Sequence, residues 1–520
     1  MTHDNAASYV RGFRYAECEC RDYAFNPYCD IPALLERHGA LITRDDYVGE
    51  NRWLDHLECD LMKFWLKSDV RDMSKGLWRS FLTDDGKQLP GLGNTGQWPP
   101  ELQRAIQKDE HGNYTAEAGA LLEGPDRNAD YNFVRAHSRQ VFAYGIAFHM
   151  TGKREYFDLC RQGADALLAL VGPDGSMYVR QELATGAWVE DKEVRTSQDL
   201  AYGMTGIGFY YYLTHDPKYL EKILLLKNYI FSEYYHPGKD VLTWLPYTNE
   251  SADQSVELVS HLDQLYAYML WLAPSLPPEH KRQFIRDMDM LVGIMLEHFY
   301  SSVYGTFWGD CKPGKTHMLG TDHTDFGHSV KAMWVIHQVG MWAENPYYMI
   351  FARERIHGIL ENAFDPGLGA WRRRFLPDGS IDRDKEWWSL AELDQAASLL
   401  AIKDPAYLQY VNHTYPFWFK NMVDNKNGEI WHVLDGGSLE PKRIFPKCHC
   451  WKTSLHSFEH VLFSYITSQQ ILHRPVDLHY AFNSLDEVRH QTVTPYLFKG
   501  YIRDKRMTEG SVRVTFDSIH

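Results

Sequence analysis

The sequence predicts an all-α protein built as a closed ring of paired helices, an (α/α)6 barrel with N-terminal, internal and C-terminal extensions. Apolar residues recur at helical spacing in long segments. These segments come in pairs joined by short polar turns, and the pairs repeat roughly every 60 residues along a chain of 520 residues. In a ring, every pair buries its apolar faces against two neighbours, and no end is left exposed.

Three of the turns within the pairs carry a helix-start signal, because Asp or Asn followed by Pro favours the beginning of a new helix. The turns are Thr151-Gly-Lys, Thr214-His-Asp-Pro, Leu276-Pro-Pro-Glu-His, Glu344-Asn-Pro and Lys403-Asp-Pro. They predict helical hairpins near residues 137–170, 198–235, 257–300, 327–363 and 388–424.

A sixth pair has to be assembled from distant segments. Residues 454–471 have helical spacing but no adjacent partner, and a helix expected near 52–68 can pair with them and close the ring. Gly- and aromatic-rich stretches between the hairpins predict loops or short strands with tight turns, gathered at one end of the ring. We expect an N-terminal extension at 1–45, the barrel at 46–474 with a loop insertion at 88–130, and a C-terminal extension at 475–520.

Composition and charge exclude several classes of protein. The net charge is −15 without a long Lys/Arg block, so nucleic-acid binding is not expected. No apolar run approaches membrane-spanning length and the N-terminus has no apolar signal core, which predicts a cytoplasmic protein without a membrane partner.

Neither the cysteines nor the glycines form a cofactor motif. The glycines at 91, 93 and 96 have no strand before them and no helix after them, so they do not predict a nucleotide site. We expect no metal and no cofactor, because the clustered cysteines lack the C-x2-C spacing of zinc sites; these are Cys18, Cys20, Cys29, Cys448 and Cys450.

Polar side chains lie near the starts of the predicted inner helices, which would converge on the axis of the ring. A salt bridge or a structural role is the alternative for each of them, since the chain has 25 histidines. His261 and Asp263 cannot share a helix face, so at most one of them points inward. The candidates are Arg139, His261, Asp263, His328, Lys331, Trp388, Glu392, Trp451 and His456.

Recurrent histidines at one end of a ring are typical of proton-transfer chemistry. Imidazole has the near-neutral pKa needed to move the proton next to a sugar carbonyl, and two groups on opposite walls suit epimerisation. The enediolate formed between the two steps needs a cation or hydrogen-bond donors.

These segments resemble the N-acylglucosamine 2-epimerase superfamily, which includes cellobiose 2-epimerases and mannose isomerases. The resemblance covers about residues 52–470 and is carried by Phe64-Trp65, Asp72, Gly76, Asp84-Asp85-Gly86, Arg139, the segment DLAYGMTGIGFYYYLTHDPKYL, Trp451-Lys452 and His456. It implies an (α/α)6 barrel with sugar 2-epimerase or aldose–ketose isomerase activity.

The resemblance also implies roles for the candidate residues. His328 and His456 would be the paired acid/base residues, assisted by His261 and Glu392. Arg139 would bind the sugar oxygens and Trp388 would form a sugar-contacting wall. Apart from the resemblance, we also expect Asp263, Lys331 and Trp451 to contact the sugar, because they lie near the starts of the predicted inner helices.

The chain departs from the family pattern at several of these positions. Asp263 stands where the family commonly has His, Tyr266 and Lys331 stand where Glu is usual, and Leu455 and Glu459 replace Tyr and Arg. Lys331 removes an expected orienter of His328. Either the site accepts a different sugar, with Lys331 as counter-charge to an anionic one, or the epimerase chemistry has been lost.

Two other functions stay open. A glycoside hydrolase or lyase on the same barrel would need two carboxylates flanking the scissile bond, and the candidates are Asp263, Asp322, Asp325 and Glu392. A non-catalytic sugar-binding protein is the other alternative. In each case the partner is a small-molecule sugar or a short oligosaccharide, and a homodimer is one assembly that the sequence permits.

Overall fold

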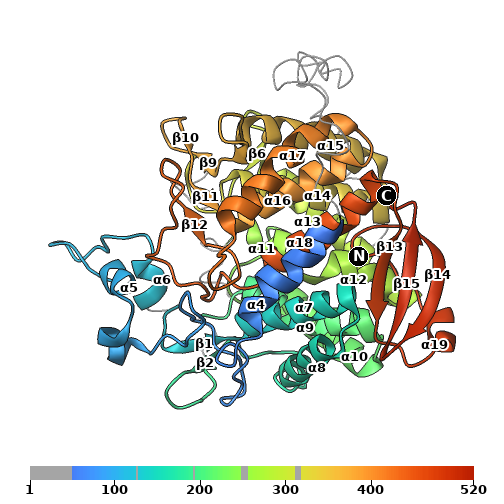
Figure 1. The fold of residues 1–520 in the computed structure, drawn as a ribbon, viewed down its shortest axis with the longest axis horizontal. Helices are drawn as coiled ribbons and strands as arrows, with labels where there is room; N and C mark the ends of the chain where they lie inside the picture. The colour runs from blue at the N-terminus through green and yellow to red at the C-terminus, as the bar shows by residue number, and fades with distance from the viewer. Residues whose placement is uncertain (1–49, 125–126, 191–193, 248–255, 311–317) are drawn as a thin grey trace.

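The computed structural model describes residues 50–124, 127–190, 194–247, 256–310 and 318–520. Within these ranges it confirms the predicted all-α ring, in which inner helices surround a common axis and each is paired with an outer helix (Figure 1). The N-terminal extension expected at 1–45, with Cys18, Cys20 and Cys29, lies outside the described residues. Among the described helices, none is both long enough and apolar enough to cross a membrane.

The inner helices are buried on all sides. In α7 and α9 every residue except the last is buried, because the ring interior lies on one side and the outer helices cover the other. The inner elements are α7 (Val134–Thr151), α9 (Ser197–Thr214), α11 (Val259–Gln264) continued by the π-turn η7 (Leu265–Met269), α12 (Leu270–Leu272) and the 3-10 turn η8 (Ala273–Ser275), α14 (Phe326–Trp342), α16 (Trp387–Ala401) and α18 (Leu455–Ile471).

The outer helices are amphipathic and start as predicted. Asp216, Asn345 and Asp404 each accept a hydrogen bond from the backbone N–H two residues on, and a proline follows each of them at the first helical position. The outer elements of the predicted hairpins are α8 (Arg154–Leu168), α10 (Pro217–Glu233), α13 (Pro278–His298), α15 (Pro346–Ala363), and η9 (Pro405–Tyr407), α17 (Leu408–Phe417) and η10 (Trp418–Met422). The observed hairpin ends agree with the predicted ones to within three residues.

The ring closes through the predicted distant pair. The last inner helix, α18, packs against α7, α16 and the N-terminal outer segment. The Trp53 indole N–H donates to the Ser468 hydroxyl at 3.1 Å, and both side chains are buried. The N-terminal outer segment consists of α3 (Glu50–Asp55), the π-turn η3 (His56–Leu61) and α4 (Met62–Trp65).

Short antiparallel strand pairs occupy the stretches predicted as loops or short strands. They are β1 (Tyr131–Phe133) with β2 (Arg180–Glu182), β3 (Tyr235–His236) with β4 (Val241–Leu242), β5 (Tyr300–Ser301) with β6 (Thr306–Phe307), β7 (Phe364–Asp365) with β8 (Ala370–Trp371), β9 (Arg374–Phe375) with β10 (Ile381–Asp382), and β11 (Lys385–Glu386) with β12 (Val433–Leu434).

The internal and C-terminal extensions lie at opposite ends of the barrel. The insertion folds into η4 (Leu92–Gln97), α5 (Pro100–Ala105) and α6 (Gly119–Glu123) around a small apolar cluster that it shares with β1, α7 and β12, and it lies on the left of Figure 1 with β9–β12. On the right, β13 (Val476–Tyr480), β15 (Ser511–Asp517) and β14 (Tyr501–Thr508) form an antiparallel sheet in that order, accompanied by α19 (Leu485–Arg489).

Candidate active site

A cavity of about 490 Å³ opens at the end of the ring where the inner helices begin. Every inner helix of the described chain contributes a side chain from its first turns, and the insertion completes the wall with Glu117, Ala120 and Leu121. Helix N-termini carry partial positive charge, so their convergence favours negative charge on a ligand. The inner-helix contributions include Arg139 (α7), Tyr202 (α9), Asp263 (α11), His328 (α14), Trp388 (α16) and His456 (α18).

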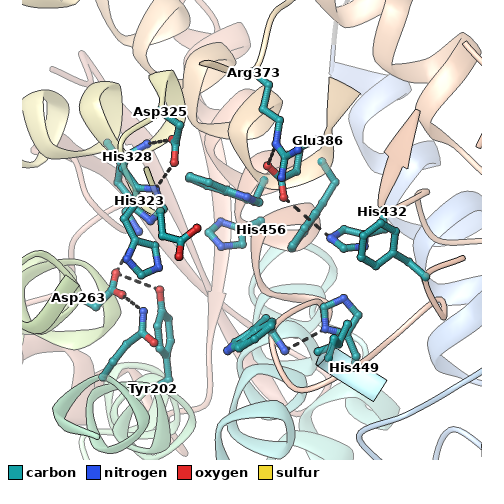
Figure 2. Close-up of a pocket in the computed structure, with 18 of the residues that line it drawn as sticks. Tyr202, Asp263, His323, Asp325, His328, Arg373, Glu386, His432, His449 and His456 are labelled. Carbon is teal, nitrogen blue, oxygen red and sulfur yellow. Dashed lines mark hydrogen bonds and ion pairs between the residues drawn. The ribbon is translucent and has the colours of Figure 1, made fainter. Parts of the chain in front are cut away.

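His328 is held by Asp325 at the start of α14. Asp325 caps the helix by accepting the His328 backbone N–H at 2.7 Å, and its second carboxylate oxygen lies 2.7 Å from the His328 ring Nδ1 (Figure 2). Burial would raise the pKa of Asp325, but the neighbouring His328 outweighs it and keeps that pKa below its ordinary value. A carboxylate at Nδ1 favours the proton there and leaves Nε2 to accept one. Asp325 is therefore the orienting carboxylate that the family pattern had led us to expect at Lys331.

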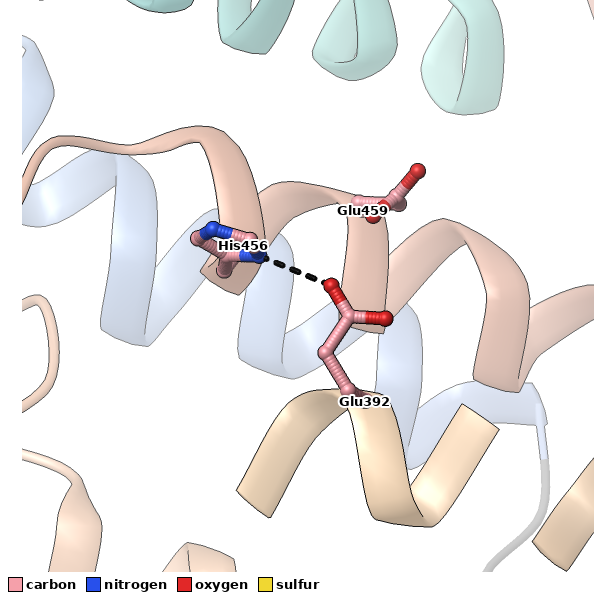
Figure 3. Close-up of side chains that lie close together, drawn as sticks. All are labelled: Glu392, His456 and Glu459. Atoms are coloured by element: carbon pink, nitrogen blue, oxygen red, sulfur yellow. Dashed lines mark ion pairs between the residues drawn. The ribbon is translucent and has the colours of Figure 1, made fainter. Parts of the chain in front are cut away.

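His456 rests on buried polar groups below the cavity. Its Nδ1 lies 3.2 Å from a Glu392 carboxylate oxygen (Figure 3) and 3.1 Å from the Tyr266 hydroxyl. Burial first, and then the charges of Arg139 and Lys331, lower the pKa of His456 well below its usual value. The imidazole is therefore neutral at pH 7 and able to accept a proton.

Glu392 and Trp388 hold different positions around His456. Glu392 accepts the Trp334 indole N–H at 2.9 Å and lies behind His456 without lining the cavity. The Trp388 ring centre lies 4.4 Å from that of His328 and 6.0 Å from that of His456. The two imidazoles thus flank one indole in the same cavity.

Asp263 and Lys331 form a buried ion pair. The Lys331 ammonium lies 3.0 Å from Asp263, which also accepts the Tyr202 hydroxyl at 3.1 Å and the Gln198 amide at 2.6 Å. Burial opposes both charges, yet each group stabilises the other, so the pKa of Asp263 is lowered and that of Lys331 is raised. Lys331 is consequently not the free counter-charge that the sequence suggested.

Arg139 is a second buried cation that lines the cavity. Its guanidinium carbon lies 3.7 Å from the Tyr202 ring centre, and its Nη1 donates to the Trp451 carbonyl. In the ranges that the structure describes, no carboxylate pairs with Arg139 and its Nε makes no hydrogen bond. Next to it, Arg127 and Arg135 share the carboxylate of Asp199, so positive charge is in excess on this wall.

The structure does not bring His261 to the cavity. The ring is fully buried, its Nδ1 donates to the Glu257 carbonyl and its Nε2 accepts the Leu242 backbone N–H. Burial lowers the pKa of His261 to about 3. Both ring nitrogens are bonded to backbone groups, one in β4 and one just before α11, so the geometry gives no support to the catalytic role expected for His261. Asp263, two residues on, is the member of this pair that faces inward.

The loops add cavity residues that the sequence reasoning missed. His449 accepts the backbone N–H groups of Trp451 and Lys452 at Nδ1, both at 3.2 Å, so its proton is on Nε2. The exposed Trp451 ring lies at the rim. The only sequence signal for His449 was its place between Cys448 and Cys450, which are buried thiols. The other missed residues include Tyr202, His323, His432 and the Arg373–Glu386 ion pair.

One group of side chains has the composition of a metal site. Glu392, His456 and Glu459 each bring a donor atom within 4.8 Å of the others (Figure 3). Glu459, however, accepts hydrogen bonds from the Tyr266 and Tyr496 hydroxyls, and Glu392 accepts one from Trp334. Both Glu459 oxygens and one Glu392 oxygen are thus already hydrogen-bonded, and the second Glu392 oxygen lies 3.2 Å from Nδ1 of His456, so a metal ion would have to displace these contacts.

Fold and cavity together define an (α/α)6-barrel protein with a histidine-containing pocket at the inner-helix N-termini. The chain is similar in structure to cellobiose 2-epimerase from Bacillus thermoamylovorans B4167, with a TM-score of 0.63 and 15% identity over 80% of this chain and 98% of that chain. It is also similar to cellobiose 2-epimerase from Spirochaeta thermophila DSM 6192, with a TM-score of 0.63 and 15% identity over 81% of this chain and 97% of that chain. A third similar structure is a D-mannose isomerase, with a TM-score of 0.61 and 14% identity over 81% of this chain and 98% of that chain.

The sequence itself gives no such match. No family model matches it, and neither does any curated protein sequence. At 14–15% identity the structural comparisons establish a shared fold, and that fold agrees with the resemblance found in the sequence motifs.

Proposed function

We propose that the protein is a sugar 2-epimerase or aldose–ketose isomerase that moves the proton at carbon 2 of its substrate. One observation carries the proposal. Two imidazoles, His328 and His456, flank Trp388 in one cavity, and each has a carboxylate at its Nδ1. Such an arrangement leaves both Nε2 atoms available for proton transfer to a ligand between them.

The proposed reaction is redox-neutral and needs only proton transfers. One histidine takes the proton from carbon 2 of the open-chain sugar, and the C–H electron pair forms the C1–C2 double bond of an enediolate. For epimerisation, the other histidine returns a proton to the opposite face of carbon 2. For isomerisation, a proton is delivered to carbon 1 instead, the O2 hydroxyl gives up its proton and O1 takes one up, so that the carbonyl moves to carbon 2. The imidazolium formed in the first step is stabilised by Asp325 or by the carboxylates behind His456.

The enediolate carries negative charge, and the cavity wall suits it. Arg139 has no carboxylate partner in the described part of the chain, and the inner-helix N-termini point toward the same space. The Trp388 ring offers a flat apolar surface for a sugar face. The same excess of positive charge supports an acidic sugar as substrate, bound through Arg139 rather than through Lys331.

The hydrolase alternative has less support from the geometry. Asp263 is paired with Lys331, Asp325 is bound to His328, and Glu392 lies behind His456. Three of the four candidate carboxylates are therefore committed to other groups. An inverting hydrolase needs two carboxylates that face the scissile bond with a water between them.

The test is incubation with aldoses, ketoses and acidic sugars in heavy water, with NMR detection of deuterium at carbon 2. We expect exchange for at least one sugar, and a loss of roughly 100-fold or more in both His328→Gln and His456→Gln. His261→Gln is the matched control, because its ring does not reach the cavity. Reducing ends released from an oligosaccharide without deuterium at carbon 2 would instead identify a hydrolase. Full exchange in both variants would refute the assignment of the two bases.

A further inference from the structure

A C-terminal segment, residues 494–498, closes the end of the barrel opposite the cavity. Tyr496 is fully buried there, with its ring stacked on Trp271 at a centre-to-centre distance of 6.3 Å. Its backbone N–H donates to the Tyr212 hydroxyl at 2.9 Å. Trp271 and Tyr212 lie near the C-terminal ends of inner helices, which are remote from the cavity mouth. Tyr496 also has φ = 57°, a strained backbone value for a non-glycine residue.

Tyr496 is connected to the cavity by a continuous hydrogen-bonded path. Its hydroxyl donates to one Glu459 oxygen at 2.7 Å. The other Glu459 oxygen accepts the Tyr266 hydroxyl, and that hydroxyl lies 3.1 Å from Nδ1 of His456. Glu459 sits one turn after His456 on α18, so the path runs through the centre of the barrel. All four side chains are buried.

We propose that Tyr496 is a positioning residue for proton transfer, which acts through Glu459 and Tyr266 to keep carboxylate charge behind His456. This rests on the function proposed above. When His456 takes a proton from the sugar, its imidazolium form needs a negative partner on the Nδ1 side. A hydroxyl that donates to Glu459 stabilises the ionised carboxylate, so the C-terminal segment becomes part of the catalytic support.

The surroundings of Glu459 make that donor important. Burial raises the pKa of Glu392 and of Glu459, and the charge of Glu392 raises the pKa of Glu459 further. Hydrogen bonds from Tyr266, Tyr496 and the Gln395 amide act in the opposite direction. The other charged or titratable groups that face His456 or Tyr266 come from the remaining inner helices: Arg139, Tyr202, Asp263, His328 and Lys331.

The test compares Tyr496→Phe with Tyr480→Phe. The first variant keeps the ring on Trp271 and removes only the hydroxyl that reaches Glu459. The second removes a hydroxyl that donates to the Thr494 carbonyl at 2.6 Å in the same region but does not touch Glu459. We expect the acid limb of kcat/KM for deuterium exchange to move up by roughly 0.5–1 pH unit in Tyr496→Phe. The profile of Tyr480→Phe should match that of the unmodified protein.

A second measurement does not depend on turnover. In protein labelled with 15N-histidine, the His456 ring signals, assigned by their loss in His456→Gln, report the ionisation of the carboxylates behind the ring. We expect their pH dependence to shift upward in Tyr496→Phe, and no further shift when that change is added to Glu459→Gln.

The outcomes separate the two proposals. Absence of exchange with every sugar would reject the function while leaving the NMR result to decide on Tyr496. Unshifted profiles in Tyr496→Phe, or equal shifts in Tyr480→Phe, would reject the role of Tyr496.

Discussion

The two cavity histidines have similar partners in different surroundings. Asp325 caps a helix and donates no proton, because His328 keeps its pKa below the ordinary value. Glu392 is fully buried, and burial raises its pKa. Asp325 should therefore stay ionised beside His328 at all pH values near neutrality. As the pH falls, Glu392 beside His456 should be protonated first.

Replacement of Asp325 tests the orientation of His328. Asp325→Asn retains the size of the side chain and can still cap α14, but it removes the charge that fixes the Nδ1 proton. We expect the exchange rate at carbon 2 to fall roughly 100-fold, with little change in KM. Asp322→Asn is the matched control, since Asp322 lines the same cavity and makes no hydrogen bond to His328 within the described residues. Equal losses in the two variants would show that the charge of Asp325 is not the cause.

Single side chains were the hardest feature to predict from the sequence. Helical spacing could say that only one of His261 and Asp263 faces inward, but the choice depends on tertiary contacts such as the hydrogen bonds of His261 to residues 242 and 257. Asp263 and Lys331 lie on different helices, so no local sequence pattern predicts their ion pair. His449 lies in a loop without a repeating pattern, where the fold alone determines what faces the cavity.

At the scale of whole elements the sequence was much more informative. The hairpins could be predicted because their turns are local signals, as Asp216-Pro217 and Asp404-Pro405 illustrate. The π-turn over Leu265–Met269 could not, since one inserted residue changes which side chains face inward without altering the apolar spacing. This turn carries Tyr266, which contacts both His456 and Glu459.

Closure of the ring can be tested at the contact between α3 and α18. Trp53→Ala would leave a large cavity between these elements and should lower the free energy of unfolding by about 3–5 kcal/mol. Urea denaturation followed by circular dichroism measures this change. Trp451→Ala is the comparison, because that ring is 42% exposed at the rim and should change stability by less than about 1 kcal/mol. A small effect of Trp53→Ala would mean that α3 contributes little to the ring.

For the molecule as a whole, buried histidines should set the dependence of stability on pH. Burial lowers the pKa of His137 to about 4 and those of His149 and His261 to about 3. An unfolded histidine titrates near 6.5, so between these values the unfolded chain binds more protons. The contribution of these histidines to the free energy of unfolding should therefore be complete above pH 6.5. It should fall as the pH drops toward 4, by about 1.4 kcal/mol per pH unit and per histidine.

Urea denaturation between pH 7.5 and pH 5 gives this slope. The raised pKa values of Glu392 and Glu459 act in the opposite direction, but the histidines outnumber them. His149→Gln should reduce the slope by about 1.4 kcal/mol per pH unit, because it removes one of these buried histidines. A stability that does not vary over this range would contradict the expectation.

The closing pair of the ring has a consequence for how the protein is made. Trp53 and Ser468, whose contact joins α3 to α18, are 415 residues apart. While the ribosome synthesises the chain, α7 and α16 each lack the neighbour that finally covers them until α18 has emerged. The nascent chain therefore exposes, for most of its synthesis, the apolar helix surface that α18 later covers. Exposed apolar surfaces of this kind are bound by chaperones or lead to aggregation. We expect the yield of folded protein in a cell to depend on how well this surface is protected before α18 is synthesised.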